Sequence, residues 1–196
     1  MTEKQMRMRT AAPWIETRAN GRPRIVGHAA VFNSWTTLYK SKVYELREVI
    51  RPGAFRTAIS EGQDVRALFD HDPSKVLGRT RAGTCRLRED AQGLLTEIDP
   101  PGTSNAADVV ELIRRGDVSG MSFAFSVRAN GWKQTTRQEN GVDIYETEIL
   151  DVDLFDVSVV TYPAYEAADV ALRHGCQGAK AHAKAIRQAR MDRLRR

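Results

Sequence analysis

Three features are scarce in this chain of 196 residues: cysteine, long apolar runs and net positive charge within the body of the sequence. Its two cysteines, Cys85 and Cys176, are too few for a disulfide framework or an unaided zinc site, so a reducing cytosolic compartment is expected. No run of 18 apolar residues occurs, which argues against a membrane span. The polar first ten residues precede no apolar stretch, so no secretory signal is expected.

The positive charge is concentrated at one end of the chain. The net charge is +5 and the pI is about 9.4, values that suggest a nucleic-acid partner. Residues 172–196 hold eight basic residues against one acidic residue, a net +7, which leaves −2 for residues 1–171. Because a groove for a phosphate backbone needs positive charge on the folded body, nucleic acid is not favoured as a partner.

Composition and turn signals divide the chain into three parts. A basic arm at 1–24 ends in a turn cluster, a domain follows at 25–171, and 172–196 form a basic, alanine-rich tail that is either helical at 179–194 or disordered. With 41% hydrophobic residues, the chain has enough apolar material for one core.

The body is predicted to consist mainly of short strands. Apolar or alternating segments predict strands at 25–32, 43–50, 65–69, 76–78, 84–88, 94–98, 118–127, 142–148 and 149–161. A short helix is predicted at 54–60 and a capped amphipathic helix at 104–115, which glycine ends. The fold class is therefore α+β and mainly β, with a closed or partly open β-barrel and flanking helices, and not an alternating β-α-β chain.

Three places in the body could carry chemistry. His71 lies at a strand end between two carboxylates, where a histidine can act as a general base, although a solvated turn histidine is the simpler interpretation. Ser122 lies on the small-residue face of the strand at 118–127, which leaves room for a substrate or for close packing. Asp156 interrupts an apolar strand and needs a partner there, either a histidine or an arginine.

Together, three ordered motifs resemble the prohead maturation proteases of HK97-like tailed phages. They are HDPSKVLGRT at 71–80, GMSFAF at 120–125 and LFDVSVVTYPA at 154–164. The segment at 26–33 also resembles the first strand of that family, and the resemblance covers about 25–170. That family is similar in turn to the herpesvirus assembly proteases, whose β-barrel is surrounded by helices.

The resemblance implies a serine endopeptidase with a Ser-His-Asp triad of Ser122, His71 and Asp156 and no metal or organic cofactor. A Gly-Leu-Ser-Leu segment in the herpesvirus enzymes selects Ser122 over Ser119 and Ser126. Their oxyanion-stabilising arginine pair has no counterpart at 162–165, so the sequence does not identify the groups that would donate hydrogen bonds to the oxyanion.

The resemblance also implies a substrate and a place of action. The substrate is the N-terminal scaffolding segment of the major capsid protein, with the protease's own ends as a second target, inside the immature capsid in the host cytoplasm. The herpesvirus enzymes are dimers, so a homodimer is a further partner to consider. The tail at 172–196 is expected to dock the enzyme on an acidic scaffold segment.

Three alternatives stay open. The chain could be a capsid-assembly or scaffolding protein that keeps the fold without cleaving. It could be a Cys-His protease, because arginines flank Cys85 and could depress the pKa of its thiol. A metal hydrolase on His71, Asp72 and Asp151 is the weakest alternative, since no second histidine has ligand spacing.

Overall fold

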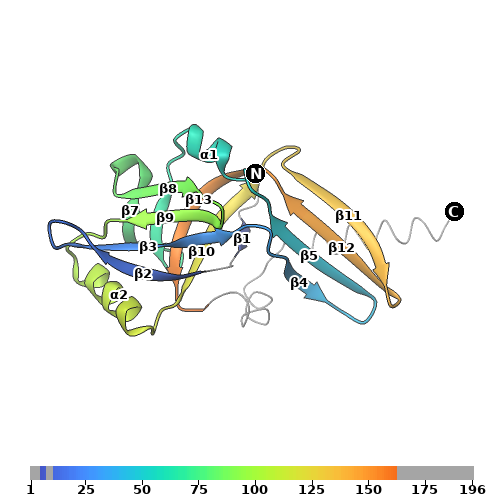
Figure 1. Cartoon of the computed structure of the whole chain (residues 1–196), viewed down its shortest axis with the longest axis horizontal. Coiled ribbons are helices and arrows are strands. Elements are labelled where there is room, and N and C mark those ends of the chain that lie inside the picture. The colour runs from blue at the N-terminus through green and yellow to red at the C-terminus, as the bar shows by residue number, and fades with distance from the viewer. Residues whose placement is uncertain (1–4, 8–10, 163–196) are drawn as a thin grey trace.

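The computed structural model describes residues 5–7 and 11–162, and within them the chain is built mainly of strands (Figure 1). Two α-helices and one 3-10 helix, η1, connect them. The elements in chain order are β1 (Gln5–Arg7), β2 (Ala11–Thr17), β3 (Pro23–Val31), β4 (Thr36–Lys40), β5 (Tyr44–Ile50), α1 (Arg56–Ser60), β6 (Arg66–Phe69), β7 (Asp72–Arg79), η1 (Thr80–Ala82), β8 (Cys85–Glu89), β9 (Gly93–Ile98), α2 (Ser104–Arg115), β10 (Gly120–Val127), β11 (Trp132–Glu139), β12 (Val142–Ile149) and β13 (Val152–Val160).

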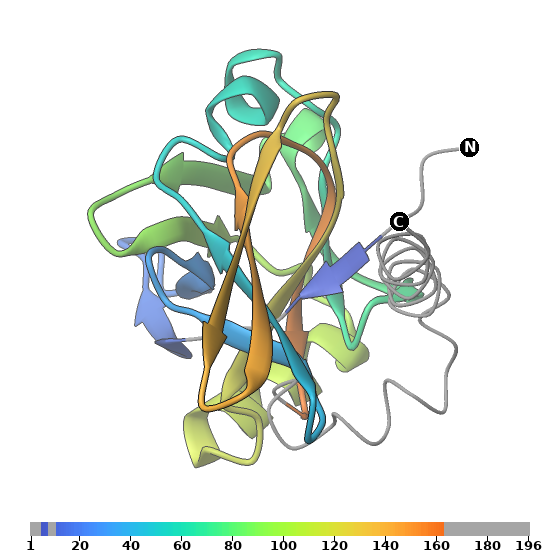
Figure 2. The ribbon, with the colours of Figure 1, turned by 90° about the vertical axis from the view of Figure 1, so that its right-hand side faces the viewer.

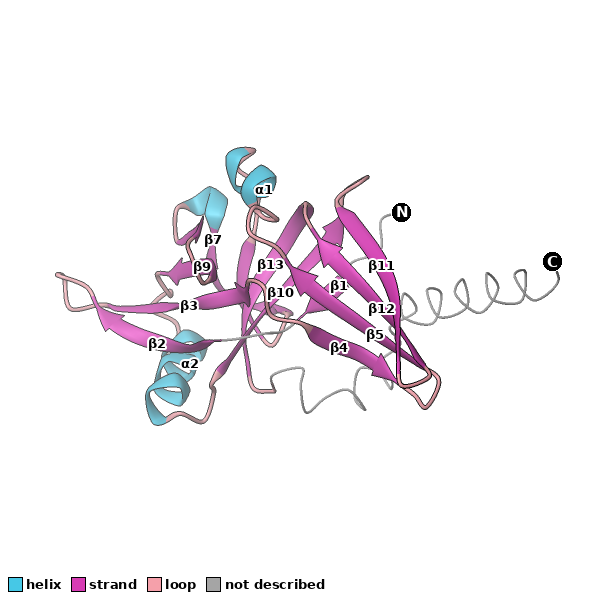
Figure 3. Ribbon diagram, turned by 45° about the vertical axis from the view of Figure 1, so that its right-hand side comes forward, coloured by secondary structure: helices cyan, strands magenta, loops and turns pink. Residues whose placement is uncertain are grey.

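The strands form three sheets. The five-stranded sheet has the order β1-β10-β13-β6-β7 and is antiparallel except between β13 and β6. A second sheet, β11-β12-β5-β4, contains one parallel pair, β12 with β5. It lies at the end of the molecule away from α2 (Figure 3), the end that faces the viewer in Figure 2. The third sheet, β2-β3-β9-β8, is wholly antiparallel.

The mainly β class with two short helices is confirmed, but no sheet closes into a barrel among the described residues. The sheets meet by packing instead of by continuous main-chain pairing. A Cβ added to Gly27 of β3 would lie 2.5 Å from the sulfur of Met121 in β10, so these two strands approach closely through side chains. Sheets that pack on one another keep open edges, whereas a closed barrel pairs every edge.

The core lies between the sheets and is centred on β10. Met121, Phe123 and Phe125 are fully buried on one face of this strand, as the alternation predicted. The rings of Phe123 and Phe125 stack with centroids 5.0 Å apart, and Phe55 meets Phe123 edge-on at 5.4 Å. Each such ring contributes about 1.5–3 kcal/mol by leaving water, so β10 is held firmly in place.

Helix α2 has the bounds that its sequence predicted. The Thr103 hydroxyl accepts a hydrogen bond from the main-chain N–H of Ala106 at its start, and Gly116 ends it with a φ of 80°. A buried stripe of Ala106, Val109, Val110 and Ile113 faces the core. The sequence pattern missed the strands β1, β2, β4 and β11.

Part of the predicted arm belongs to the sheets, since β1 pairs with β10 and β2 pairs with β3. The division into arm, domain and tail stays a prediction. The tail, with its expected helix at 179–194, lies outside the described residues.

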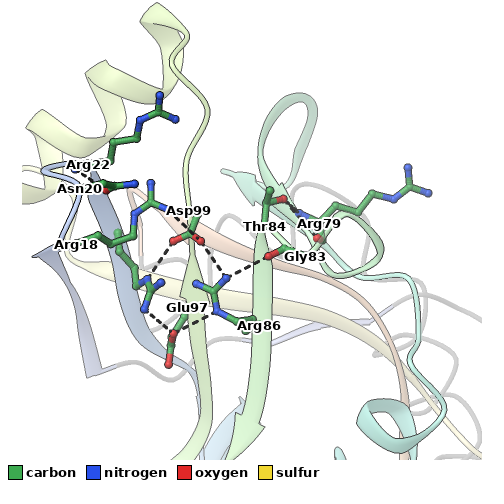
Figure 4. A network of polar contacts seen from close by, with 10 residues as sticks. Arg18, Asn20, Arg22, Arg79, Gly83, Thr84, Arg86, Glu97 and Asp99 are labelled. Carbon is green, nitrogen blue, oxygen red and sulfur yellow. Dashed lines mark hydrogen bonds and ion pairs between the residues drawn. The ribbon is translucent and has the colours of Figure 1, made fainter.

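Partly buried cross-strand ion pairs lie on one face of the β2-β3-β9-β8 sheet (Figure 4). Arg24 and Arg86 both contact Asp99 and Glu97, with the shortest contact 2.9 Å between Arg86 and an Asp99 oxygen. Burial acts to raise the pKa of Asp99, but hydrogen bonds from Arg86 and Arg24 outweigh it and lower that pKa. The network is part of the scaffold and joins neighbouring strands of one sheet.

Candidate active site

Ser122 lies in the middle of β10, on the face opposite the core aromatics. Its Cα pairs with that of Ser158 in the neighbouring strand β13. Ser122 is 0% exposed, so its hydroxyl lies beneath other groups in this structure. Ser119, in contrast, is exposed and precedes the strand, which leaves Ser122 and Ser126 as the buried serines of β10.

Asp156 lies two residues before Ser158 on the same face of β13, and it is 1% exposed. A carboxylate so deeply buried is costly unless hydrogen bonds compensate it. Its Oδ1 accepts one from the Ser158 hydroxyl at 3.0 Å and lies 2.5 Å from Nδ1 of His71. Of the two partners that the sequence allowed, histidine or arginine, the structure supplies the histidine.

His71 occupies the turn of the β6–β7 hairpin. Phe69 pairs with Asp72, so Asp70 and His71 form a two-residue loop, and both have positive φ values, 51° and 56°. Such a loop is the type I′ geometry, which glycine and asparagine adopt more readily than histidine. Backbone conformations of this kind cost about 1–3 kcal/mol and persist where surrounding contacts hold them.

Asp70 supplies contacts that hold the turn. Its carboxylate accepts hydrogen bonds from the main-chain N–H of Thr161 at 2.8 Å and from the Thr161 hydroxyl at 3.1 Å. Its own N–H donates to the carbonyl of Val159 at 2.9 Å. The turn is thereby fixed to the end of β13, the strand that carries Asp156.

The three side chains meet in one line of hydrogen bonds. Nε2 of His71 lies 2.7 Å from Oγ of Ser122, and Nδ1 lies 2.5 Å from Oδ1 of Asp156. They come from β10, from β13 and from the turn after β6, which are neighbours in the five-stranded sheet. The His71 side chain is 15% exposed and the other two are fully buried, so His71 is the member that reaches solvent.

The residues of the alternative metal site all lie in the described part of the chain and are not grouped there as metal ligands. Asp72 accepts hydrogen bonds from the main-chain N–H and the hydroxyl of Ser74, which lower the pKa of its carboxyl, and it also pairs with Lys75. Within residues 5–7 and 11–162, no three histidine, cysteine, aspartate or glutamate side chains group as metal ligands. His28 is a buried histidine of β3, and its Nε2 lies 2.9 Å from a carboxylate oxygen of Asp90.

The prediction of a depressed cysteine pKa is wrong. Cys85 is 2% exposed in β8, and burial raises the pKa of its thiol to about 12, which outweighs the opposing charge of Arg86. A thiol with that pKa is protonated at neutral pH and is a poor nucleophile. Cys85 is therefore a core residue of the β2-β3-β9-β8 sheet.

No helix in the described part of the chain is both long and apolar enough to cross a membrane.

Comparison with known proteins decides the family. A family model described as the Caudovirus prohead serine protease matches residues 12–183. The chain belongs to the Caudovirus prohead serine protease family. The resemblance to prohead proteases drawn from the three motifs is thus confirmed.

Two individual proteins are similar to the chain, one in sequence and one in structure. The prohead protease of Enterobacteria phage HK97 is 27% identical over 157 residues, which cover 78% of this chain and 64% of that protein. The chain therefore spans just under two thirds of the length of this relative. Among solved structures, the bacteriophage T4 capsid assembly protease, gp21, is similar over 78% of this chain and 97% of that chain, with 9% identity and a TM-score of 0.40.

The sequence did not indicate the contacts that two residues of the site, Ser158 and Asp70, make in the structure. The sequence gives Ser158 no role beyond its place two residues after Asp156, and Asp70 is only one of the two carboxylates beside His71. The adjacency of Asp70 to the histidine was visible, but its contact with Thr161 depends on strand pairing that the sequence does not reveal.

Proposed function

We propose that this member of the prohead serine protease family is an endopeptidase whose triad is Ser122, His71 and Asp156. The observation that carries the proposal is the continuous line of hydrogen bonds from the Ser122 hydroxyl through both ring nitrogens of His71 to Asp156. A hydroxyl, an imidazole and a buried carboxylate in this order form the arrangement that activates a serine for acyl transfer.

Each group has one task in the proposed reaction. Ser122 Oγ attacks the carbonyl carbon of the scissile peptide while its proton moves to Nε2 of His71. His71 then delivers that proton to the departing amine, and an acyl group is left on Ser122. Water, activated in turn by His71, hydrolyses this ester. Asp156 holds the proton on Nδ1 and stabilises the imidazolium that forms in each half of the reaction.

The complete burial of Ser122 adds a requirement. A peptide carbonyl cannot approach a hydroxyl that has no exposed surface, so the groups that cover Ser122 must move before substrate can bind. The proposed enzyme is therefore closed in the state described by this structure.

The proposed substrate follows from the family and not from a groove. It is the N-terminal scaffolding segment of the major capsid protein, together with the ends of the protease itself, and cleavage takes place inside the prohead in the host cytoplasm. A partly open barrel of the herpesvirus protease type and a homodimer belong to the same proposal, as does docking through the tail at 172–196.

Co-expression with the capsid protein tests the proposal. The wild-type chain should shorten the capsid protein, and Ser122→Ala should leave it at full length. Ser126→Ala is the matched control, because it removes the same atom from another buried serine of β10. Shortening by the Ser122→Ala protein would disprove the assignment of the nucleophile.

The burial of Ser122 favours one second candidate, a capsid-assembly or scaffolding protein that keeps the fold and does not cleave. In that case wild type and Ser122→Ala would both leave the capsid protein intact, and both would support shell assembly equally. The same co-expression experiment therefore separates the two functions.

A further inference from the structure

A fourth side chain contacts two members of the proposed triad. Ser158 is 0% exposed, and its Cα lies opposite that of Ser122 across the β10–β13 ladder. Its hydroxyl oxygen lies 3.0 Å from Oδ1 of Asp156 and 3.2 Å from Nδ1 of His71. It therefore lies beside the pair of atoms whose hydrogen bond orients the imidazole.

The chemistry of the three groups fixes the direction of these hydrogen bonds. An ionised carboxylate only accepts, so the single proton of the Ser158 hydroxyl is donated to Asp156. The Ser158 oxygen can then act only as an acceptor towards Nδ1. Because both neighbours of Nδ1, the Ser158 oxygen and the Asp156 carboxylate, accept hydrogen bonds, Nδ1 must carry the ring proton. The other ring nitrogen, Nε2, is left as the acceptor for the proton of Ser122.

We propose that Ser158 is a positioning residue that holds Asp156 in place and keeps the His71 proton on Nδ1. The proposal rests on the proposed function, because it concerns how the same triad is prepared for reaction. Ser158 acts through Asp156 and His71 and does not touch the reacting atoms. Its role is to keep Nε2 free before the attack and the carboxylate aligned when the imidazolium forms.

Replacement by alanine isolates the hydroxyl. Ser158→Ala removes one hydrogen bond to a charged group, so kcat should fall about tenfold while KM stays within about twofold. Ser158→Thr keeps the hydroxyl and should recover most of the lost rate. Ser126→Ala, the same change in the neighbouring strand, should leave both constants near those of wild type.

Kinetics on the capsid protein give the first test, with thermal melting of every variant alongside. A role confined to packing would lower the melting temperature and leave kcat of the folded protein unchanged, which would overturn the proposal. Loss of all activity in Ser158→Ala, to the level of Ser122→Ala, would also overturn it, since Ser158 would then be as strong a candidate for the nucleophile as Ser122. If the wild-type chain does not cleave at all, the proposed function fails and this inference is judged by the second test.

The second test needs no substrate. Proton NMR of the ¹⁵N-labelled protein reads the Nδ1–H of His71 directly, with the resonance assigned by its absence from a His71→Gln variant. Ser158→Ala should shift this resonance, because Asp156 loses its second donor, whereas Ser126→Ala should not. An unchanged resonance in Ser158→Ala would refute the positioning role, and Ser158→Cys, which keeps a weak donor, gives the same readout if the alanine variant does not fold.

Discussion

Replacing Asp156 by asparagine removes one negative charge from the buried side of His71 and changes little else. Oδ1 of Asp156 lies 2.5 Å from Nδ1, and the side chain is 1% exposed, so water cannot replace the lost charge. Two unit charges about 4 Å apart attract by about 4 kcal/mol at an effective dielectric constant of about 20. Because about 1.4 kcal/mol is a factor of ten in rate, kcat should fall about a thousandfold from this attraction alone.

The side-chain amide of the asparagine lowers the rate in a second way. If its NH₂ group faces Nδ1, the ring proton must move to Nε2, and Nε2 can no longer accept the proton of Ser122. The same aspartate-to-asparagine change in the chymotrypsin-type triad costs about 10⁴-fold through the wrong tautomer, so a loss of about 10³–10⁴ is expected here.

The assay is capsid-protein cleavage by purified protein, with kcat and KM measured separately. Asp153→Asn is the matched control, since it makes the same change on the same strand at a partly exposed ion pair with Arg128. Its kcat should stay within a few-fold of wild type, because exposed ion pairs contribute about 0–1 kcal/mol. A folded Asp156→Asn protein with undiminished kcat would remove Asp156 from the mechanism.

Three further predictions concern the surroundings of the site and the scaffold. Asp70→Ala should lower kcat about three- to tenfold by freeing the His71 turn, whereas Asp72→Ala should not; equal effects of the two would contradict the anchoring role. Iodoacetamide at pH 8 should leave activity intact, because the pKa of the buried Cys85 thiol is about 12; loss of activity in step with alkylation would contradict this. A hydrogen bond from Arg47 lowers the pKa of the buried Glu45 from 4.5 to about 2, against the opposing effect of burial, so the stability that it adds is complete above pH 4.5 and is lost as pH falls towards 2. Glu45→Gln should remove about 3 kcal/mol of that pH dependence in urea unfolding, and parallel curves for the two proteins would refute the assignment.

The sequence predicted the elements whose local signals are strong. Helix α2 was placed from its capping threonine, its apolar stripe and its terminal glycine, all of which act within the helix itself. The strands with buried alternation, such as β5 and β10, were found for the same reason. Each of the three candidate site residues is chemically unusual for its position: a histidine in a turn, a serine on a small-residue face and an aspartate in an apolar strand. It was the resemblance to the prohead proteases that selected Ser122 among the serines and joined the three as a proposed triad.

What the sequence could not provide depends on pairing between distant segments. Strand β11 is polar and exposed along nearly its whole length, so it carries no apolar alternation, and only its ladder with β12 makes it a strand. The role of Ser158 required the register that sets β13 beside β10. Asp70 and Asp72 are equally close to His71 in the chain, and only the fold shows which of them is bonded to Thr161.

The central claim is that the Ser122 hydroxyl is the nucleophile, and covalent labelling tests it most directly. The protein is incubated with a fluorophosphonate, and the modified residue is located by peptide mass spectrometry. We expect slow labelling at Ser122, since the site must open first, with no label in Ser122→Ala and an unchanged label in Ser126→Ala. An adduct on another residue, or none on a wild-type protein that cleaves the capsid protein, would contradict the mechanism proposed for this chain.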